Sequence, residues 1–403
     1  MKKRNTQDNL LKALVYAASS LSLLVLVALL SFMLQKGWGS LSLDLFTRPY
    51  WSEPISIEYP SIYPGEFESP TDLPEGAVFS EAYGFALIDS TNPKKEAVLE
   101  LVYLDPNSPL NHGTNIQAGH EGEAATVVVG YWVDKIGYMN TKGVVRSSGR
   151  IVGQNAQKTI QALDQSVSLE NAYVQTKGGG IVGSLLATLY LIFVSLLLAL
   201  PIGISTAIYL NEYAKRNMLT SWIRSSIELL TGVPSIVFGL MGVLVLFPIT
   251  ALFSAQGTSI LLGGLTLSVI LLPIIIRTTE ESLKVVPQSF RDASLSLGAN
   301  QSQTLFKIVI PSAIPGILTA TLLGIGRIIG ESAALIYTMG TFVSDDPKLL
   351  KGATSLAVQI WSIMSGDQPN FALASAISLV ILLIVLILNF SVKLLAKRFR
   401  KVW

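Results

Sequence analysis

Six apolar runs dominate the hydrophobic pattern of the chain. Each is close to the roughly 20 residues that an α-helix needs to span the hydrocarbon core of a bilayer. The pattern predicts six transmembrane helices, over residues 11–34, 181–210, 227–253, 259–276, 314–339 and 371–395. The first run follows a charged MKKR start, but it is too long for a signal-peptide core and no small-residue cleavage site follows it. Residues 1–35 are therefore expected to hold the N-terminus and a retained first helix.

Composition supports this interpretation of the runs. Of the 403 residues, 50% are hydrophobic and 14% are charged, and the mean hydropathy is +0.52, whereas an ordinary soluble domain is about one quarter charged. These values indicate an integral membrane protein. The net charge of +2 is too small to indicate nucleic-acid binding. The absence of cysteine excludes disulfides, thiolate metal sites and thiol catalysis.

Lysine and arginine residues set the expected orientation, because they concentrate in the cytoplasmic loops of membrane proteins. If the N-terminus is cytoplasmic, the four inner segments carry 16 of these residues, whereas the two short outer loops carry only Lys348 and Lys351. Both termini are therefore expected to be cytoplasmic. Residues 36–179 are expected to be extracytoplasmic, and residues 180–403 to form the core with the other five helices.

The insert at 36–179 has the composition of a folded soluble domain. Strands are predicted at 97–104 and 125–133 and a helix at about 157–169, between turn-rich segments. His112 and His120 have no acidic or histidine partner at a metal-motif spacing and are interpreted as surface residues. The predicted fold is an all-α polytopic membrane protein with an inserted β-rich extracytoplasmic domain.

The chain has no motif for catalysis or nucleotide binding. GxxxxGK[ST], HExxH and GxSxG are all absent, so neither an active site nor a cofactor or metal site is expected on it. The three glycines at 178–180 could present backbone amides to an anion. A flexible joint between the insert and the second helix is the simpler interpretation.

The segment 277–311 is too long and too amphipathic to be a simple connector. Residues 289–297 place Phe290, Leu295 and Leu297 among polar residues, which suits a short helix that lies along the membrane and contacts a cytoplasmic partner. Gly298 follows, and the chain can turn there because glycine reaches positive φ without steric strain. An amphipathic surface helix without a partner is the alternative.

The spacing in this segment resembles the EAA motif of permease subunits of ABC importers. That motif runs Glu-Ala-Ala, three residues, Gly, nine residues, Ile, one residue, Leu-Pro. Here it reads Asp292, Ala293, Ser294, Gly298, Ile308, Ile310 and Pro311, with Asp for Glu, Ser for Ala and Ile for Leu. The resemblance implies a type I importer permease. It also implies a coupling helix that fits a groove of a separate ATPase and transmits its ATP-driven closure.

Four further segments resemble the PstA family of phosphate-importer permeases. They are YLNEYA at 209–214, TGVPSIVFGLMG at 231–242, the stretch 271–299, and GRIIGESAAL at 326–335. The sister PstC family differs after the Gly-Glu pair, and the large insert departs from the short connection of the family. The resemblance implies a subunit of the bacterial cytoplasmic membrane without catalytic activity. Its implied partners are a PstC-like permease, two PstB-like ATPases that bind ATP and Mg, and a PstS-like phosphate-binding protein.

The fifth apolar run carries two charged residues, Arg327 and Glu331. An arginine at bilayer depth costs about 2.5–3.5 kcal/mol on insertion scales, so it should face protein or a water-filled path. The two residues are four apart, share a helix face and can partly neutralise each other. A guanidinium donates paired hydrogen bonds to phosphate oxygens, which makes Arg327 a candidate pathway residue and Glu331 its partner. The alternative is a buried structural ion pair.

Other residues complete the set of candidates. Gly326 and Gly330 form a small-xxx-small pair that would admit a neighbouring helix. Arg277, at the inner end of the fourth helix, is the second pathway candidate, although topology alone explains a cation there. The resemblance assigns functional importance to both arginines. Pro201 and Pro234 are expected to kink their helices.

The predicted function is the permease subunit of an ATP-driven phosphate importer. Sulfate and molybdate permeases share the EAA loop and remain alternatives for the substrate. A secondary transporter or a membrane-anchored sensor would need no loop that binds an ATPase. The inverted repeats typical of secondary transporters are not detected either.

Overall fold

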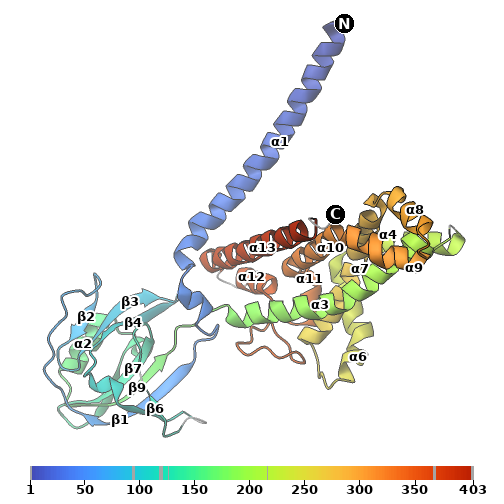
Figure 1. Cartoon of the computed structure of the whole chain (residues 1–403). Helices are drawn as coiled ribbons and strands as arrows, with labels where there is room; N and C mark the ends of the chain where they lie inside the picture. The colour runs from blue at the N-terminus through green and yellow to red at the C-terminus, as the bar shows by residue number, and fades with distance from the viewer. Residues whose placement is uncertain are drawn as a thin grey trace. The chain divides into compact units, whose positions relative to one another are not determined.

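The chain folds into two compact units (Figure 1). The computed structural model describes residues 2–92, 96–117, 121–125, 127–215, 217–365 and 369–400. One unit is formed by Met1–Ser42 together with Ile181–Trp403, and the other by Leu43–Gly180. His120 lies outside the described residues, as do Arg216 and Lys401, which belong to the 16 lysine and arginine residues counted above for the inner segments.

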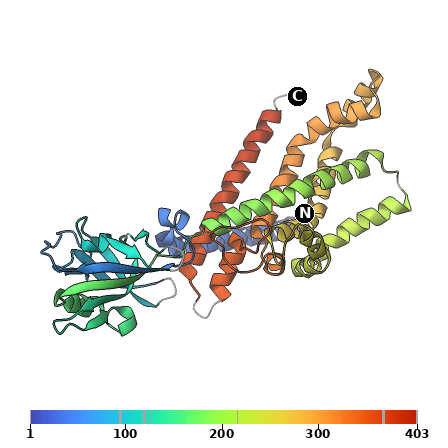
Figure 2. The same cartoon turned by 90° about the horizontal axis from the view of Figure 1, so that it is seen from below.

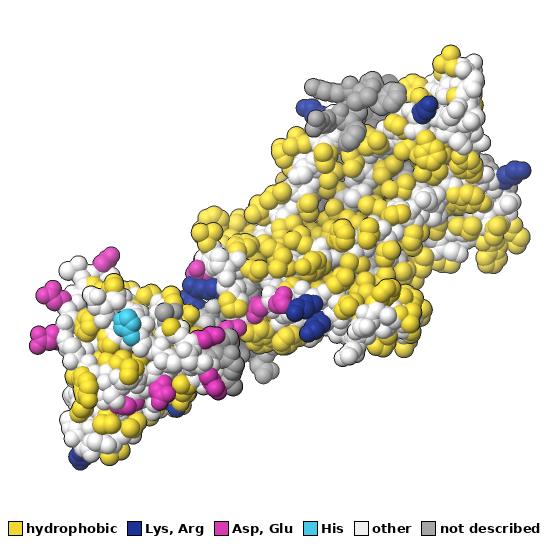
Figure 3. Space-filling view, turned by 60° about the horizontal axis from the view of Figure 1, so that its bottom comes forward, with side chains coloured by type: hydrophobic (Ala, Val, Ile, Leu, Met, Phe, Trp, Pro, Cys, Tyr) yellow, Lys and Arg dark blue, Asp and Glu magenta, His cyan; other side chains and the backbone are white. Residues whose placement is uncertain are grey.

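The first unit is helical, and hydrophobic side chains cover much of its surface in Figure 3. Its long helices are α1 (Lys2–Gly37), α3 (Val182–Ile208), α7 (Ile260–Val285), α10 (Ile310–Gly330) and α13 (Phe371–Arg400). Its shorter helices are α4 (Met218–Gly232), α5 (Ser235–Met241), α6 (Phe247–Ala251), α8 (Gln288–Ser296), α9 (Gln301–Thr304), α11 (Ala333–Thr338) and α12 (Leu356–Ser365). Three π-helical segments are η5 (Tyr209–Tyr213), η6 (Gly242–Leu246) and η7 (Leu305–Val309). In the described part of the chain, five helices are long and apolar enough to cross a membrane, or six if one bent pair is counted as a span.

Small residues let α3 and α7 pack closely at the centre of this unit. A Cβ atom on Gly203 of α3 would lie 2.6 Å from Ile275 Cγ2, and one on Gly264 of α7 would lie 2.5 Å from Val194 Cγ1. Both distances are shorter than real side chains tolerate, so glycine is required for this approach. α10 packs against both helices, and α13 packs against α10 and α1 (Figure 2).

The third predicted helix, 227–253, is not a single straight helix. α4 ends at Gly232, and α5 begins at Ser235 after a bend of 105°. Val233 is extended, with φ −74° and ψ 128°, and Pro234 follows it. A residue before proline avoids the helical region, and proline has no N–H to donate, so the helix breaks here instead of kinking slightly. Pro201, by contrast, lies inside α3, which continues without a break to Ile208.

Two other helix boundaries differ from the prediction. The fourth helix continues nine residues beyond 276, so Arg277 lies within α7 and the loop proper begins at Val286. Val286 is extended because Pro287 follows it. The fifth predicted helix, 314–339, is interrupted, because α10 ends at Gly330 and Glu331 is extended. The Glu331 carboxylate accepts a bond from the Ala334 N–H, at 3.4 Å.

The second unit confirms the prediction of a β-rich insert. Among its described residues, nine antiparallel strands form one sheet in the order β2-β3-β4-β7-β9-β1-β5-β6, with β8 paired to β7. The strands are β1 (Pro54–Ile62), β2 (Val78–Ser80), β3 (Phe85–Thr91), β4 (Ala97–Leu104), β5 (Gly113–Asn115), β6 (Ala124–Ala125), β7 (Trp132–Met139), β8 (Val145–Ser148) and β9 (Ser168–Gln175). Helix α2 (Ala156–Asp164) buries Ile160 and Leu163 in a core shared with Leu87, Leu101 and Ile136 of the sheet.

Two local predictions in the insert were wrong. The strand expected at 125–133 begins only at Trp132, because the chain turns at Gly130, which has a φ of 98°. The helix expected to reach residue 169 ends at Asp164, and Leu169 belongs to β9. The strand at 97–104 is confirmed as β4.

Two of the glycines at 178–180 are hydrogen bonded to another backbone segment of the insert. The Gly179 N–H donates to the Tyr50 carbonyl at 2.9 Å, and the Gly180 N–H donates to the Pro49 carbonyl at 3.0 Å. A Cβ atom on Gly178 would lie 2.6 Å from the Tyr50 carbonyl oxygen. Glycine is needed because two backbone segments run side by side at this position.

Candidate functional site

The first part of the candidate site is α8, the short helix predicted within the EAA-like segment. It has no buried residue. Phe290 and Leu295 are 46% and 48% exposed, and Leu297, which follows the helix, is 90% exposed. Phe290 and Leu295 are thus exposed apolar side chains on one short helix. Asp292 and Ala293 lie on the same helix, and Asp292 accepts a hydrogen bond from Gln288 at 3.1 Å.

The turn after α8 has the geometry that the EAA-like spacing predicts. Gly298 has a φ of 87°, and no atom lies within 4 Å of the position where its Cβ would be. The Ser294 hydroxyl is 2.9 Å from the Thr304 hydroxyl, so the serine that replaces alanine in the motif links α8 to α9. Asn300 caps α9 through a reciprocal pair of hydrogen bonds with Gln303.

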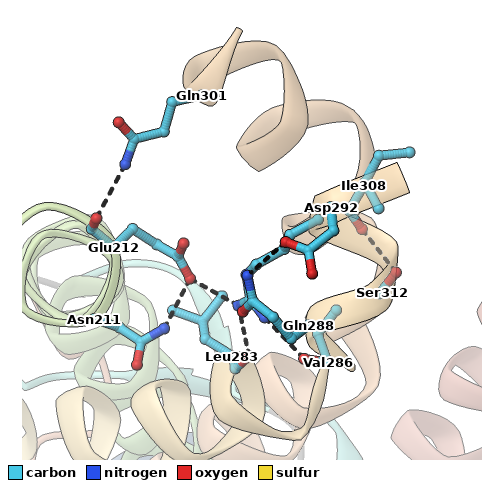
Figure 4. Close-up of polar contacts among 10 residues, drawn as sticks. Asn211, Glu212, Leu283, Val286, Gln288, Asp292, Gln301, Ile308 and Ser312 are labelled. Atoms are coloured by element: carbon cyan, nitrogen blue, oxygen red, sulfur yellow. Dashed lines mark hydrogen bonds and ion pairs between the residues drawn. The ribbon is translucent and has the colours of Figure 1, made fainter. Parts of the chain in front are cut away.

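The end of the EAA-like motif forms the start of α10. Ile308 lies in the π-helical segment η7, and Pro311 stands in the first turn of α10. Proline has no N–H for the carbonyl of residue 307, which favours a wider turn at this point. The Ser312 hydroxyl donates to the Ile308 carbonyl at 2.7 Å (Figure 4).

Arg291, the residue before Asp292, anchors α8, and the sequence motifs gave no indication of this role. Its Nη2 atom lies 2.9 Å from Glu212 Oε1, and the two side chains are 14% and 12% exposed. Glu212 lies in η5, within the YLNEYA segment. Two stretches that carry the family resemblance therefore meet at an ion pair. The sequence offered one signal of this pairing. Glu212 is a carboxylate at the expected cytoplasmic end of a predicted membrane helix, where cationic residues are the rule.

The second part of the candidate site is the Arg327–Glu331 pair at the end of α10. Arg327 Nη2 lies 3.2 Å from Glu331 Oε2, and the side chains are 47% and 5% exposed. The glutamate is thus buried while much of the guanidinium is free to meet another group. The segment 231–242, which also resembles the PstA family, packs against α11 beside this pair. A Cβ atom on Gly239 of α5 would lie 2.8 Å from Ala334 Cα.

The glycines beside this pair have no close neighbour among the described residues. A Cβ atom on Gly326 or Gly330 would meet no described atom within 4 Å. The expected approach of a neighbouring helix at the small-xxx-small pair therefore does not occur within the described chain, where α10 contacts α7 and α3 through other faces. Thr319, Leu323, Gly326, Arg327 and Gly330 are all exposed and recur at helical spacing along α10.

The two candidate arginines lie at different distances from α8 along their helices. α7 and α10 run antiparallel, with Gly324 of α10 near Leu271 of α7. Arg277 is eight residues from the end of α7, and Arg327 is 17 residues from the start of α10. At 1.5 Å per residue these are about 12 Å and about 25 Å from the α8 end of the unit. The structure does not bring Arg277 and Arg327 together, and both are exposed in the single chain.

Comparison with known families identifies the helical unit. Residues 199–401 match the family described as binding-protein-dependent transport system inner membrane component. The chain belongs to this family. It is a multi-pass membrane permease subunit of an ABC importer, and a transport component instead of an enzyme.

Individual relatives of this permease agree with the family match. The chain is 36% identical over 231 residues to the probable ABC transporter permease protein YqgI of Bacillus subtilis (strain 168). That match covers 54% of this chain and 77% of the relative. It is 34% identical to the phosphate transport system permease protein PstA 2 of Mycobacterium bovis, covering 53% and 71% of the two chains. A solved structure of the inward-facing MetNI methionine ABC transporter matches at 21% identity and a TM-score of 0.45, over 54% of this permease and 95% of that chain.

Proposed function

We propose that the chain is the permease subunit of an ATP-driven phosphate importer. The assignment of phosphate as the substrate rests on the half-exposed side chain of Arg327. Its guanidinium is paired with the buried carboxylate of Glu331 at the break between α10 and α11. A guanidinium offers planar paired donors that match phosphate oxygens. The names of relatives such as PstA 2 support phosphate over other oxyanions. Arg277 would meet the anion nearer the cytoplasm.

The proposed orientation follows from the positive-inside rule. Both termini and the α8 loop face the cytoplasm, and the β-rich insert is extracytoplasmic. This orientation requires six spans, so the bent pair of α4 and α5–α6 counts as one of them. The proposed partners are a PstC-like permease that completes the path, two PstB-like ATPases and a PstS-like binding protein. The exposed faces of Arg277 and Arg327 are available to such a second permease.

We propose that α8 binds the ATPase through its exposed apolar side chains. Replacing Leu297 with aspartate is expected to weaken ATPase binding by about 2 kcal/mol, or about 30-fold, because a charge would enter an apolar contact. Leu297 is 90% exposed, so the permease itself should fold normally. Binding of the ATPase to detergent-solubilised permease is the measurement. Leu43→Asp is the matched control, since Leu43 is 84% exposed in the insert. Equal binding by both variants would contradict this role of α8.

Uptake by the assembled importer tests the substrate. With the partner permease, the ATPases and the binding protein reconstituted in vesicles, labelled phosphate should accumulate only when ATP is present on the side of the membrane that holds the ATPases. A hundredfold excess of sulfate should not compete. ATP-dependent uptake that sulfate or molybdate abolishes would instead indicate another oxyanion importer, the alternative substrate class.

A further inference from the structure

A polar cluster outside the proposed pathway joins α8 to the end of α3 (Figure 4). Its centre is the ion pair between Arg291 and Glu212, at 2.9 Å. α8 has no buried residue, yet these two side chains are only 14% and 12% exposed. The pair is therefore mostly buried, although the helix that carries Arg291 is exposed. Such a pair interacts more strongly than an ordinary surface ion pair.

The end of α3 is bound by side chains from several other elements. The last carbonyls of a helix lack partners within the helix, and cationic or amide donors can satisfy them. The Leu210 carbonyl accepts from Arg224 of α4 at 2.7 Å, and the Glu212 carbonyl accepts from Gln301 of α9 at 3.1 Å. Asn211 donates to the Glu212 carboxylate at 2.7 Å. The π-helical segment η5 is thus bonded to the neighbouring α4 and to α9, which is distant in sequence.

The same guanidinium also holds the end of α7. Arg291 Nη1 donates to the Val286 carbonyl at 2.8 Å, and Nη2 donates to the Leu283 carbonyl at 3.1 Å. Arg291 therefore connects α8, the end of α7 and the carboxylate of η5. A planar guanidinium with five fixed donors can make these contacts at once, whereas an ammonium cannot reproduce the geometry.

We propose that Arg291 and Glu212 are positioning residues that make the end of α3 move together with α8. The inference rests on the proposed coupling of α8 to an ATPase. The backbone joins α8 directly to α7 and α9, whereas α3 lies more than 70 residues earlier in the chain. Among the described residues, α3 packs against α7, and its end is bonded to α8 through the Arg291–Glu212 pair. When the Arg291–Glu212 pair is intact, a displacement of α8 moves the end of α3 as well as α7. α3 in turn packs against α10, the helix that carries Arg327.

The first test measures coupling in the reconstituted importer. Glu212→Gln keeps the shape of the side chain and removes its charge, and it should lower phosphate transported per ATP hydrolysed by about tenfold. ATPase binding should be unchanged. Arg291→Lys retains the charge but loses the fork of donors, and it should fall between wild type and Glu212→Gln. Glu100→Gln is the matched control, because it removes the Lys177–Glu100 pair of the insert, at 2.7 Å. An unchanged coupling ratio in Glu212→Gln would overturn the proposal.

The second test measures the movement itself and does not depend on the substrate. The chain contains no cysteine, so Tyr213→Cys in η5 and Gln288→Cys in α8 can each carry a spin label. With Glu212 present, the distance between the labels should be the same in the nucleotide-free and ATP-bound assembly. With Glu212→Gln added, the distance should differ between the two states. A distance that changes with ATP while Glu212 is present would show that α8 moves independently of α3.

The two tests separate this proposal from the proposed function. An assembly that takes up no phosphate but keeps a constant label distance, lost in Glu212→Gln, would refute the substrate and support the role of the pair. An assembly that takes up phosphate with an ATP-dependent label distance would support the substrate and refute the role of the pair.

Discussion

Replacing Arg327 with alanine is expected to lower phosphate uptake about 100-fold while leaving the ATPases bound. The Arg327 side chain is 47% exposed, and its guanidinium can donate two charge-assisted bonds to the anion. Each such bond contributes about 1.5 kcal/mol, and together they account for two orders of magnitude. ATPase binding should persist because α8 lies about 25 Å away along α10. Initial rates of labelled phosphate uptake, with co-purification of the ATPases, provide the measurement.

Two further variants distinguish a pathway residue from a structural ion pair. Alanine at 327 leaves the 5%-exposed Glu331 carboxylate unpaired, which alone could disturb the break between α10 and α11. The double variant Arg327→Ala/Glu331→Gln removes this unpaired charge. If Arg327 contacts phosphate, the double variant should transport as poorly as the single one, and Arg327→Lys should also be strongly impaired. Recovery of uptake in the double variant would show that the pair only fixes packing.

The sequence predicted the helical unit well where hydrophobicity alone decides the structure. Uninterrupted apolar runs became α1, α3 and α13, and the strand at 97–104 became β4. The misses occurred where a local backbone restraint overrides hydrophobicity. Pro234 turns a predicted single helix into a 105° bend, and another apolar run is interrupted at Glu331, whose backbone is extended. A hydropathy value averaged over such a run does not reveal a single residue whose backbone conformation is restricted.

Only those parts of the candidate site that depend on residues close together in the chain could be predicted. The EAA-like spacing located α8 and the turn at Gly298, because these depend on positions close together in the chain. It did not reveal that Arg291 pairs with Glu212, since 78 residues and two predicted membrane helices lie between them. Nor did it reveal that glycines at residues 178–180 bond to the backbone of Pro49 and Tyr50. Long-range polar contacts and close backbone approaches become visible only in the folded chain.

Replacing Gly298 with valine is expected to uncouple ATP hydrolysis from uptake. Gly298 has a φ of 87°, a region that a β-branched residue enters only with strain of about 1–3 kcal/mol. No atom lies within 4 Å of the added Cβ, so the damage should come from the backbone and not from a clash. Relief of the strain would rotate α8 relative to α9 and break the Ser294–Thr304 bond, at 2.9 Å. The apolar side chains of α8 would then meet the ATPase in the wrong orientation.

The measurement for this variant is the amount of phosphate transported per ATP hydrolysed in reconstituted vesicles, which should fall about tenfold or more. Gly143→Val is the matched control. Gly143 has a φ of 71°, also has no atom within 4 Å of the position a Cβ would take, and lies in the turn between β7 and β8 of the insert. It should suffer comparable backbone strain and leave the coupling ratio unchanged. Equal coupling ratios in the two variants would mean that the α8–α9 turn does not transmit the movement, because strain of the same kind would then act alike at both sites.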